Sequence, residues 1–382
     1  MSLPAVPPAP RAAKRRRASR WRRRVIGAGI VTAALGAGAC VAIHELPWFG
    51  PLVADLGREV VGARAVAWVE DTVYGAEDAW NVTVRGGEKP KVFWAAPSTE
   101  AQADAGAPPN FTPPHEQVSA AGDGVWVPVR AATDPGPIAM YKSLVHPDPR
   151  RPFAAVAVVA MDLRLLGLSL VAGTKEPASE RIPSDRRRGL VPVDDQGALV
   201  AVFNGGFKAV HGSYGMRIGR DTFLPAREGA CTISIRAGVV SIGTWTGADD
   251  AAGVFRQTPP CLVEGGQANA GLSDGATAWG ASVGGGTIIR RSALGLTKDR
   301  TFLLYGLGDA VSARSLGEAM TVAGASDVAE LDVNQSFPRF FLVERGAGTI
   351  EVKEPIVPDI RYSPSDYVAK PSERDFFYVR RR

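Results

Sequence analysis

The chain of 382 residues is 45% hydrophobic and 22% charged, which suits one large or two ordinary globular domains. Its 43 glycines and 29 prolines favour many turns and a β-rich fold over a helical bundle. Nine basic residues and no acidic residue lie within residues 1–24, so removing that segment changes the formal net charge from +5 to −4. A body of negative charge excludes nucleic-acid-binding domains that carry a basic surface.

The basic tail, residues 1–24, precedes 19 residues without a charge, VIGAGIVTAALGAGACVAI at 25–43. At about 1.5 Å per residue, such a helix spans roughly the 30 Å of a hydrocarbon core. The basic flank lies only on the N-terminal side. The sequence therefore predicts a single-pass transmembrane signal-anchor, with the N-terminus in the cytoplasm and the body in the periplasm or the extracellular space.

Three other interpretations of residues 25–43 stay open. One is a cleaved signal peptide, although the run exceeds the usual apolar region of about 7–15 residues. Another is lipidation at Cys40, which follows the small residues Gly38 and Ala39. The third is a buried helix of a soluble protein, against which the adjacent arginines argue. RRRVIG at 22–27 also bears a slight likeness to a twin-arginine export signal.

Two connecting segments are predicted between the apolar run and the main body. Apolar residues recur three and four positions apart over 50–80, as at Leu52, Leu56 and Val60, which predicts helix. A Pro-, Ala- and Gly-rich interval follows and is typical of a linker. The first strand of the main domain is expected near Val127 or Phe153. The boundaries predicted in this way are 44–90 for a helical stalk, 91–150 for the linker and domain entry, and 151–382 for the main domain.

The main domain contains short apolar runs bounded by Gly, Pro or Asp, which predict β-strands. The stretch CTISI-RAG-VVSIG at 231–243 predicts a hairpin with Gly238 in its turn. Ser315-Leu-Gly-Glu318 fits a capping box and predicts a helix over 315–324. These patterns predict an α+β fold, with a mixed, largely antiparallel sheet and flanking helices. The runs are 153–161, 198–203, 231–235, 239–243, 287–290, 301–307, 328–333 and 340–343.

Two cysteines of the body, Cys231 and Cys261, are candidates for a disulfide if the body lies outside the cytoplasm. The alternative, two buried free thiols, stays open because pairing geometry cannot be read from sequence. Two cysteines and four scattered histidines show no zinc-ligand spacing, so no metal or other cofactor is predicted. A divalent ion near Asp332 would lack the dense acidic loop of a calcium site.

The run ALVAVF ends abruptly in Asn204-Gly205-Gly206. Consecutive glycines permit positive φ and let a ligand approach the main chain, whose N–H groups bind anions such as phosphate. His211 and Tyr214 follow and are candidates for lining the same cleft, with His211 as a reserve proton carrier. An ordinary tight turn, in which Asn-Gly is common, is the alternative.

Two further stretches carry polar groups beside predicted strands. In ELDVNQS, residues 330–336, Asp332 and Asn334 share one face of an extended chain, and Ser336 prolongs that face if the strand continues. A carboxylate, an amide and a hydroxyl suit sugar recognition or acid–base chemistry, and a polar strand edge is the alternative. Arg291 leaves another strand and is a candidate for holding a phosphate with two hydrogen bonds, or for a solvated charge.

In order and spacing, these stretches resemble the phosphodiester glycosidase domain family, over roughly residues 153–345. No single motif is specific, but six in the family's order are hard to produce by chance. One departs from the family: where its members typically have Leu-Asp-Gly-Gly-Gly-Ser, this chain has Leu-Asp-Val-Asn-Gln-Ser, so the loop after Asp332 must differ. The matching stretches are Asn204–Phe207, the hairpin 231–243, Leu262–Gly266, Arg291–Gly295, Ser315–Glu318 and Leu331–Ser336.

The resemblance implies a hydrolase of sugar phosphodiesters or related glycosidic bonds in envelope or exported glycans. It implies that Arg291 and the backbone of Asn204, Gly205 and Gly206 hold the phosphate. Asp332 would provide acid–base catalysis or bind the sugar.

Asn334 and Ser336 would bind hydroxyls or water, and Glu264 is a second carboxylate for chemistry that needs two. A membrane-anchored, non-catalytic polysaccharide-binding protein is the alternative, and the altered loop favours it. A structural envelope protein without a ligand is the third possibility.

Overall fold

The structure, a computed structural model, describes residues 63–95, 106–247, 253–273, 287–334, 336–346 and 348–382. Its contacts divide the chain into Met1–Gly62 and Ala63–Arg382, and only the second unit is described. No helix in these ranges is long and apolar enough to cross a membrane. The tail 1–24 and the predicted anchor 25–43 lie outside the described residues.

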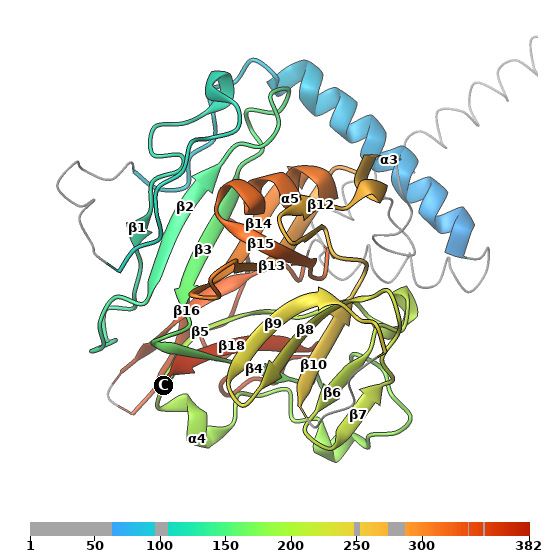
Figure 1. Ribbon diagram of the computed structural model, residues 1–382, viewed down its shortest axis with the longest axis vertical. Coiled ribbons are helices and arrows are strands. Elements are labelled where there is room, and N and C mark those ends of the chain that lie inside the picture. The colour runs from blue at the N-terminus through green and yellow to red at the C-terminus, as the bar shows by residue number, and fades with distance from the viewer. Residues whose placement is uncertain (1–62, 96–105, 248–252, 274–286, 335, 347) are drawn as a thin grey trace, which may run out of the picture. The chain divides into compact units, whose positions relative to one another are not determined.

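Three antiparallel sheets form the body of the described residues (Figure 1). This confirms a largely antiparallel fold with few helices, although several sheets stand where one was expected. The eight-stranded sheet has the order β1 (Val127–Pro128), β2 (Met140–Val145), β3 (Val156–Asp162), β14 (Phe302–Val311), β13 (Ile289–Thr297), β15 (Ala325–Glu330), β11 (Val263–Glu264) and β12 (Gln267–Ala268).

The two other sheets each have five strands among the described residues. One has the order β7 (Asp221–Leu224), β6 (Met216–Ile218), β10 (Val254–Thr258), β8 (Cys231–Arg236) and β9 (Val239–Thr244). The other has the order β17 (Ile350–Pro355), β16 (Phe340–Arg345), β5 (Leu199–Asn204), β18 (Phe376–Arg381) and β4 (Leu166–Val171).

The described helices are few and mostly short. They are α3 (Ala63–Arg85), α4 (Val193–Gln196), α5 (Ala313–Val322) and the 3₁₀ turns η2 (Glu116–Val118), η3 (Ser184–Arg186), η4 (Ala209–His211) and η5 (Ala270–Ser273).

The strand β3 is apolar from Val156 to Met161 because both of its faces are covered. Val158 belongs to the core beneath α5, whereas Val159 belongs to the core shared by the three sheets. A strand buried on both faces is a continuous apolar run instead of an alternating one, as 153–161 is. The helix lies close on this sheet, since a Cβ added at Gly306 would lie 2.4 Å from Met320 Sδ.

The capping box predicted for α5 was misplaced by three residues. The helix begins at Ala313, and Ser312 is its N-cap, whose side-chain oxygen accepts from Ser315 N at 3.0 Å. Glu318 does not reach back to the cap; it faces His115 at 3.7 Å. A serine hydroxyl caps the helix, as predicted. The serine is Ser312, however, and the group it binds three residues later is the backbone N–H of Ser315.

The predicted domain entry contributes strands to the main sheet. β2 lies between β1 and β3 and is largely buried, so the sheet begins at Val127, one of the two starts considered. The helical pattern predicted over 50–80 coincides with α3 from residue 63 onward. Arg151 binds that helix to the body through Asp78, with Nε donating to Oδ1 at 2.8 Å.

Candidate active site

Three of the predicted stretches meet at the end of β5. Asn204, the last residue of that strand, donates from Nδ2 to Ser292 Oγ on β13 at 2.9 Å. The Ser292 hydroxyl donates to the backbone carbonyl of Asp332 at 3.2 Å, and Asp332 N donates to Gly205 O at 3.1 Å. Hydrogen bonds therefore join segments separated by 88 and 40 residues in the chain.

The side-chain amide of Asn204 makes all of its hydrogen bonds within the protein. Its Oδ1 accepts from the Tyr305 hydroxyl at 2.7 Å and from Arg339 N at 3.1 Å, and its Nδ2 also donates to Gly205 O at 3.3 Å. The residue is only 3% exposed. Asn204 thus anchors the turn and has no hydrogen-bonding group left for a ligand.

The two glycines leave room for two side chains of the protein itself, Asp375 and Arg256. Neither Gly205 nor Gly206 has a positive φ. A Cβ on Gly205 would lie 2.2 Å from Asp375 Oδ2, and one on Gly206 would lie 2.7 Å from Arg256 Cζ. Gly206 N donates to Asp375 Oδ2 at 2.9 Å, so the anion bound here is a carboxylate of the chain, in the place where a phosphate was predicted.

A fourth stretch, Arg374-Asp375 before β18, completes the site and was missed from sequence. Arg374 Nη1 forms an ion pair with Asp332 Oδ2, and its guanidinium carbon lies 3.6 Å from the Phe337 ring centre. Asp375 Oδ2 accepts from Arg256 Nε at 2.8 Å. The available signal was a pair of charges directly before the apolar run FFYV. We call Asn204, Gly205, Gly206, Ser292, Asp332, Arg374 and Asp375 the Asp332 cluster.

The chain after Asp332 turns instead of continuing as a strand. β15 ends at Glu330; Asn334 N donates to Asp332 Oδ1 at 3.1 Å, and Ser336 N donates to Asn334 Oδ1 at 3.3 Å. In both turns a short polar side chain accepts from the backbone two residues on. Asn334 and Ser336 therefore lie half-buried in a turn beside Asp332, not on one face of a strand as predicted.

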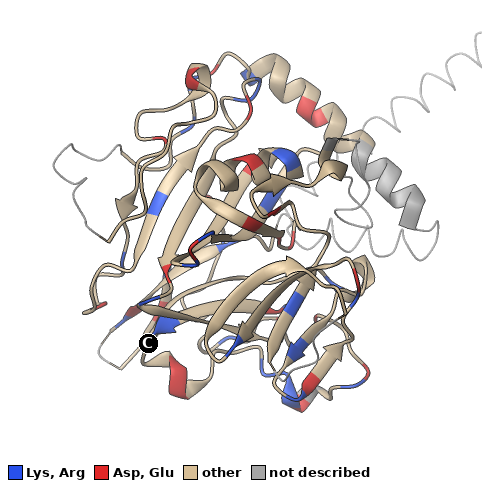
Figure 2. Ribbon diagram, viewed as in Figure 1, with Lys and Arg blue, Asp and Glu red and all other residues tan. Residues whose placement is uncertain are grey.

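Arg291 is fully buried, and its guanidinium is bound within the protein. Nη1 pairs with Glu330 Oε1 at 2.5 Å, Nε donates to Val311 O at 3.2 Å, and Nη2 donates to Thr287 O at 3.0 Å. Burial raises the pKa of the Glu330 carboxyl, and the positive charge of Arg291 offsets only part of that shift. The donors predicted to clamp a phosphate face a carboxylate and two carbonyls instead. In Figure 2 charged residues are sparse along the eight-stranded sheet, to which both residues belong.

His211 and Tyr214 lie on the segment that follows the glycine turn. His211 ends η4 and is half-buried. The Tyr214 ring packs edge-on against Phe207 at 6.2 Å, and the Arg227 guanidinium lies 5.3 Å from its centre. Burial raises the pKa of the Tyr214 hydroxyl, Arg227 opposes the shift, and the charge of Glu330 adds to it.

Glu264 is exposed on β11, beside the edge strand β12, and takes no part in the hydrogen bonds of the Asp332 cluster among the described residues. Its two carboxylate oxygens accept from Thr244 N and Thr244 Oγ1, each at 2.8 Å. Cys231 and Cys261, which sequence left as paired or free, form a disulfide across 30 residues.

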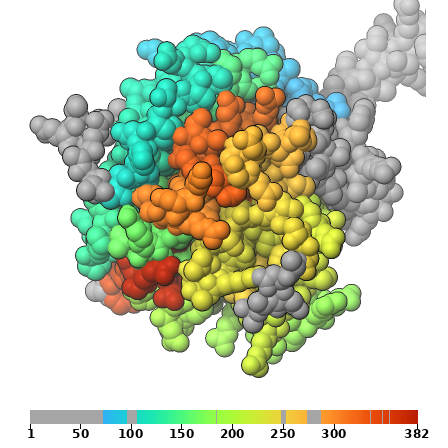
Figure 3. All heavy atoms as spheres, viewed as in Figure 1, coloured from blue at the N-terminus to red at the C-terminus, as the bar shows by residue number. Residues whose placement is uncertain are grey.

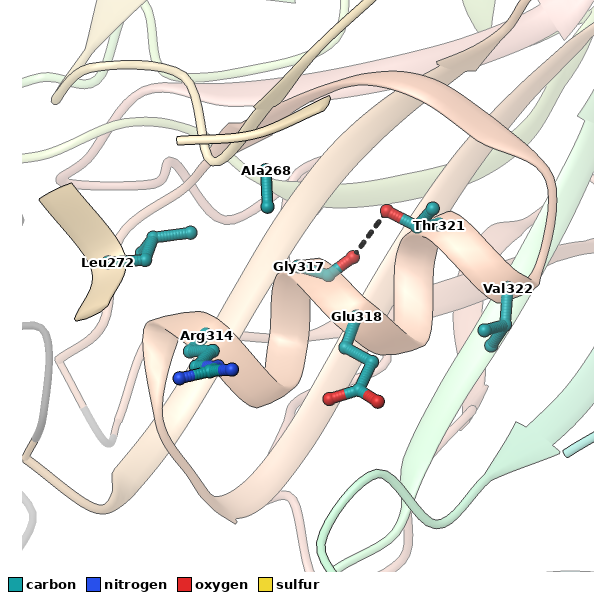
Figure 4. A pocket seen from close by; sticks show the side chains of 7 residues that line it. All are labelled: Ala268, Leu272, Arg314, Gly317, Glu318, Thr321 and Val322. Carbon is teal, nitrogen blue, oxygen red and sulfur yellow. Dashed lines mark hydrogen bonds between the residues drawn. The ribbon is translucent and has the colours of Figure 1, made fainter. Parts of the chain in front are cut away.

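One hollow lies beside α5, and its lining includes Gly317 and Glu318 of the predicted stretch Ser315–Glu318. It has a volume of about 240 Å³ and is lined by Ala268, Leu272, Arg314, Gly317, Glu318, Thr321 and Val322. Figure 4 shows Leu272 and Ala268 facing the helix across it, and Figure 3 shows the gold segment with β12 bordering the orange segment with α5. In the part of the chain that the structure describes, no three His, Cys, Asp or Glu side chains group to hold a metal ion.

No family model and no curated protein matches the chain. The catalytic domain of zebrafish N-acetylglucosamine-1-phosphodiester alpha-N-acetylglucosaminidase, auto-inhibited by its pro-peptide, is 12% identical, with a TM-score of 0.39 over 67% of this chain and 88% of that chain. A hypothetical protein from Synechocystis is 12% identical, with a TM-score of 0.33 over 64% and 62% of the two chains. A putative exported protein from Burkholderia pseudomallei is 12% identical, with a TM-score of 0.31 over 64% and 75%. The chain therefore has a weak structural similarity to a glycosidase domain, and this similarity says nothing of shared chemistry.

Proposed function

We propose that this protein hydrolyses sugar phosphodiesters or related glycosidic bonds in envelope or exported glycans. The observation that carries the proposal is the meeting of Asn204, Ser292 and Asp332 through hydrogen bonds of 2.9 and 3.2 Å. These residues belong to three stretches whose order resembles the phosphodiester glycosidase family. Motifs of an active site must be neighbours in space, so their contact here supports the resemblance.

Asp332 is the catalytic base of this proposal. Hydrolysis breaks the bond between the anomeric carbon and the leaving oxygen, and the base takes a proton from the attacking water. The carboxylate is held in one orientation, since Oδ1 accepts from Asn334 N and Oδ2 pairs with Arg374. Asn334 and Ser336 are placed to bind sugar hydroxyls or the water. Tyr214 and His211 stay in the proposal as residues of the cleft, with His211 as a reserve proton carrier.

The groups predicted to bind the phosphate already have partners within the protein. The amide of Gly206 is bound to Asp375, and the guanidinium of Arg291 to Glu330. A phosphate reaches either donor only by displacing a carboxylate. The turn around Asn334 is therefore the more accessible place for a ligand, because its residues are half-buried.

The test is sugar release by the full-length protein, purified in detergent, from a panel of sugar 1-phosphodiesters and O-glycosides that includes UDP-N-acetylglucosamine. We expect release by the wild type and a fall in kcat of about 10²–10⁴-fold in Asp332→Asn, the range for loss of a general base. Glu318→Gln changes an exposed carboxylate on α5 and should keep the wild-type rate.

Folding must be checked beside activity, because Asp332 is buried and paired with Arg374. Melting temperature and near-ultraviolet circular dichroism serve for this. A folded Asp332→Asn variant with wild-type turnover would remove Asp332 from the proposal. A wild type that releases no sugar from any compound would contradict the activity itself.

A polysaccharide-binding protein without turnover is the second candidate. Two observations favour it: the groups of the Asp332 cluster already have partners inside the protein, and Val333 and Asn334 stand where the family typically has glycines. Binding that raises the melting temperature without sugar release would support this candidate.

We also propose that residues 25–43 anchor the protein in a membrane, with its body outside the cytoplasm. The Cys231–Cys261 disulfide supports this placement, because disulfides persist in oxidising compartments. Protease added to intact spheroplasts or cells should degrade the body; protection of the body in intact preparations would contradict the placement.

A further inference from the structure

Glu330 is a buried carboxyl group with one oxygen unoccupied. It ends β15 and is fully buried. Oε1 pairs with Arg291 Nη1 at 2.5 Å, whereas Oε2 has no hydrogen-bond partner among the described residues. Buried polar atoms are nearly always satisfied, so this exception calls for a reason. Asp332, the proposed base, follows two residues later in the chain.

We propose that Glu330 is the proton donor of the site, with Asp332 as the base. The proposal rests on the proposed hydrolysis. The proton on Glu330 Oε2 passes to the oxygen that leaves the anomeric carbon, and the electrons of the broken bond leave with that oxygen. Water attacks the same carbon and gives a proton to the Asp332 carboxylate. Asp332 then loses a proton to solvent and Glu330 regains one, so no further reactant is needed.

The two carboxyl groups have the contrasting surroundings that this division of roles needs. Burial raises the pKa of Glu330, and Arg291 offsets part of that shift. Each carboxyl group pairs with an arginine, but both oxygens of Asp332 are bound, whereas Glu330 Oε2 has no hydrogen-bond partner among the described residues. Glycosidases assign the acid and the base in this way, with their carboxyl groups roughly 5–9.5 Å apart.

Glu264, the second carboxylate suggested by sequence, is a weaker candidate for the donor, because it is exposed and already accepts two hydrogen bonds from Thr244.

A proton donor at Glu330 widens the substrate class of the site. A phosphate leaves a sugar with little help from an acid, whereas an alcohol oxygen needs a proton as it departs. The site is therefore suited to ordinary O-glycosides as well as to sugar phosphodiesters. Glu330 is fully enclosed in this structure, so substrate binding must open a path to Oε2.

The test compares two leaving groups on the same sugar. Alkyl and 2,4-dinitrophenyl glycosides of the sugar that the wild type releases are given to full-length wild type and Glu330→Gln. We expect kcat/KM for the alkyl glycoside to fall about 100-fold or more, and that for the dinitrophenyl glycoside to fall less than about tenfold. A merely structural role of Glu330 would lower both values equally.

The pH profile gives a second readout. Because a donor must be protonated, wild-type kcat/KM for the alkyl glycoside should fall at high pH, and this fall should be absent in Glu330→Gln. If that variant does not fold because Arg291 is left unpaired, the double variant Glu330→Gln/Arg291→Met removes both charges and takes its place in the comparison.

The outcomes separate this proposal from the one on which it rests. No sugar release by the wild type contradicts the hydrolysis itself. Release by the wild type, with equal losses for both leaving groups or with no loss, overturns the role of Glu330 and leaves the hydrolysis standing. A leaving-group-dependent loss in Glu264→Gln would move the donor to Glu264.

Discussion

The geometry of the Asp332 cluster depends on the buried amide of Asn204. Asn204→Ala leaves Arg339 N without its acceptor and removes a partner of Ser292, so we expect the free energy of unfolding to fall by about 2–4 kcal/mol. Tyr305→Phe removes hydrogen bonds to two acceptors that each keep another donor, so we expect about 1–2 kcal/mol. Urea unfolding of the full-length variants measures both.

Ser213→Ala is the control for these variants, because its exposed hydroxyl bonds only locally, to Ala209 O at 3.2 Å. It should change the free energy of unfolding by less than about 0.5 kcal/mol. A larger effect for Tyr305→Phe than for Asn204→Ala would show that Asn204 is not the anchor of the turn.

At this scale the sequence singled out three stretches that meet at the end of β5, but it did not predict what their side chains bind. The pair Gly205-Gly206 indicated a close approach to the main chain, and a close approach exists. The approaching groups are Asp375 and Arg256, which no local pattern connects to the glycines. A glycine in the sequence indicates that a side chain at that position would clash, but it does not indicate which residue the side chain would meet.

The disulfide ties the start of β8 to the segment before β11. A cross-link over 30 residues is expected to contribute about 3–4 kcal/mol through the unfolded chain, so Cys231→Ala/Cys261→Ala should lower the free energy of unfolding by that amount. The unreduced, denatured wild type should also show one reactive thiol, Cys40, of its 3 cysteines. Three reactive thiols would contradict the pairing.

Elements with local signals were predicted better than elements defined by their neighbours. The hairpin of β8 and β9 turns through Ala237 and Gly238, with φ of 47° and 77°, as its sequence predicts. β18 was missed, although it lies between β5 and β4 in its sheet. Its six residues, FFYVRR, begin with a run of strand-forming residues, so the local signal was present and overlooked, and only its place between β5 and β4 depends on tertiary pairing.

In the whole molecule, the site is held by hydrogen bonds and ion pairs whose partners are far apart in the chain. Gly206 and Asp375 are separated by 169 residues, and Arg374 and Asp332 by 42. Sequence patterns report spacings of a few residues, so they predicted the separate stretches and missed the fourth. Burying such charges demands exact partners, because an unpaired charge in the interior is costly.

The pH dependence of stability tests two buried carboxyl groups, Asp134 and Glu330. Burial alone would raise the pKa of Asp134, but hydrogen bonds from Arg381 and Gly136 lower it below its usual 3.8, so its contribution to stability is lost as pH falls through that lowered value. The contribution of Glu330 to stability has the opposite pH dependence. Its pKa is raised above the usual 4.5, so its contribution is complete below pH 4.5 and is lost as pH rises.

We therefore expect two variants to flatten opposite sides of the stability curve. Glu330→Gln should reduce the decline in the free energy of unfolding above pH 4.5 by up to about 1.4 kcal/mol per pH unit, the slope for one proton. Asp134→Asn should reduce only the decline in acid. Urea titrations from about pH 3 to pH 8 measure both slopes. An unchanged slope in Glu330→Gln would mean that the folded and unfolded chains hold this proton equally, and a carboxyl group of ordinary pKa would be a poor proton donor at neutral pH.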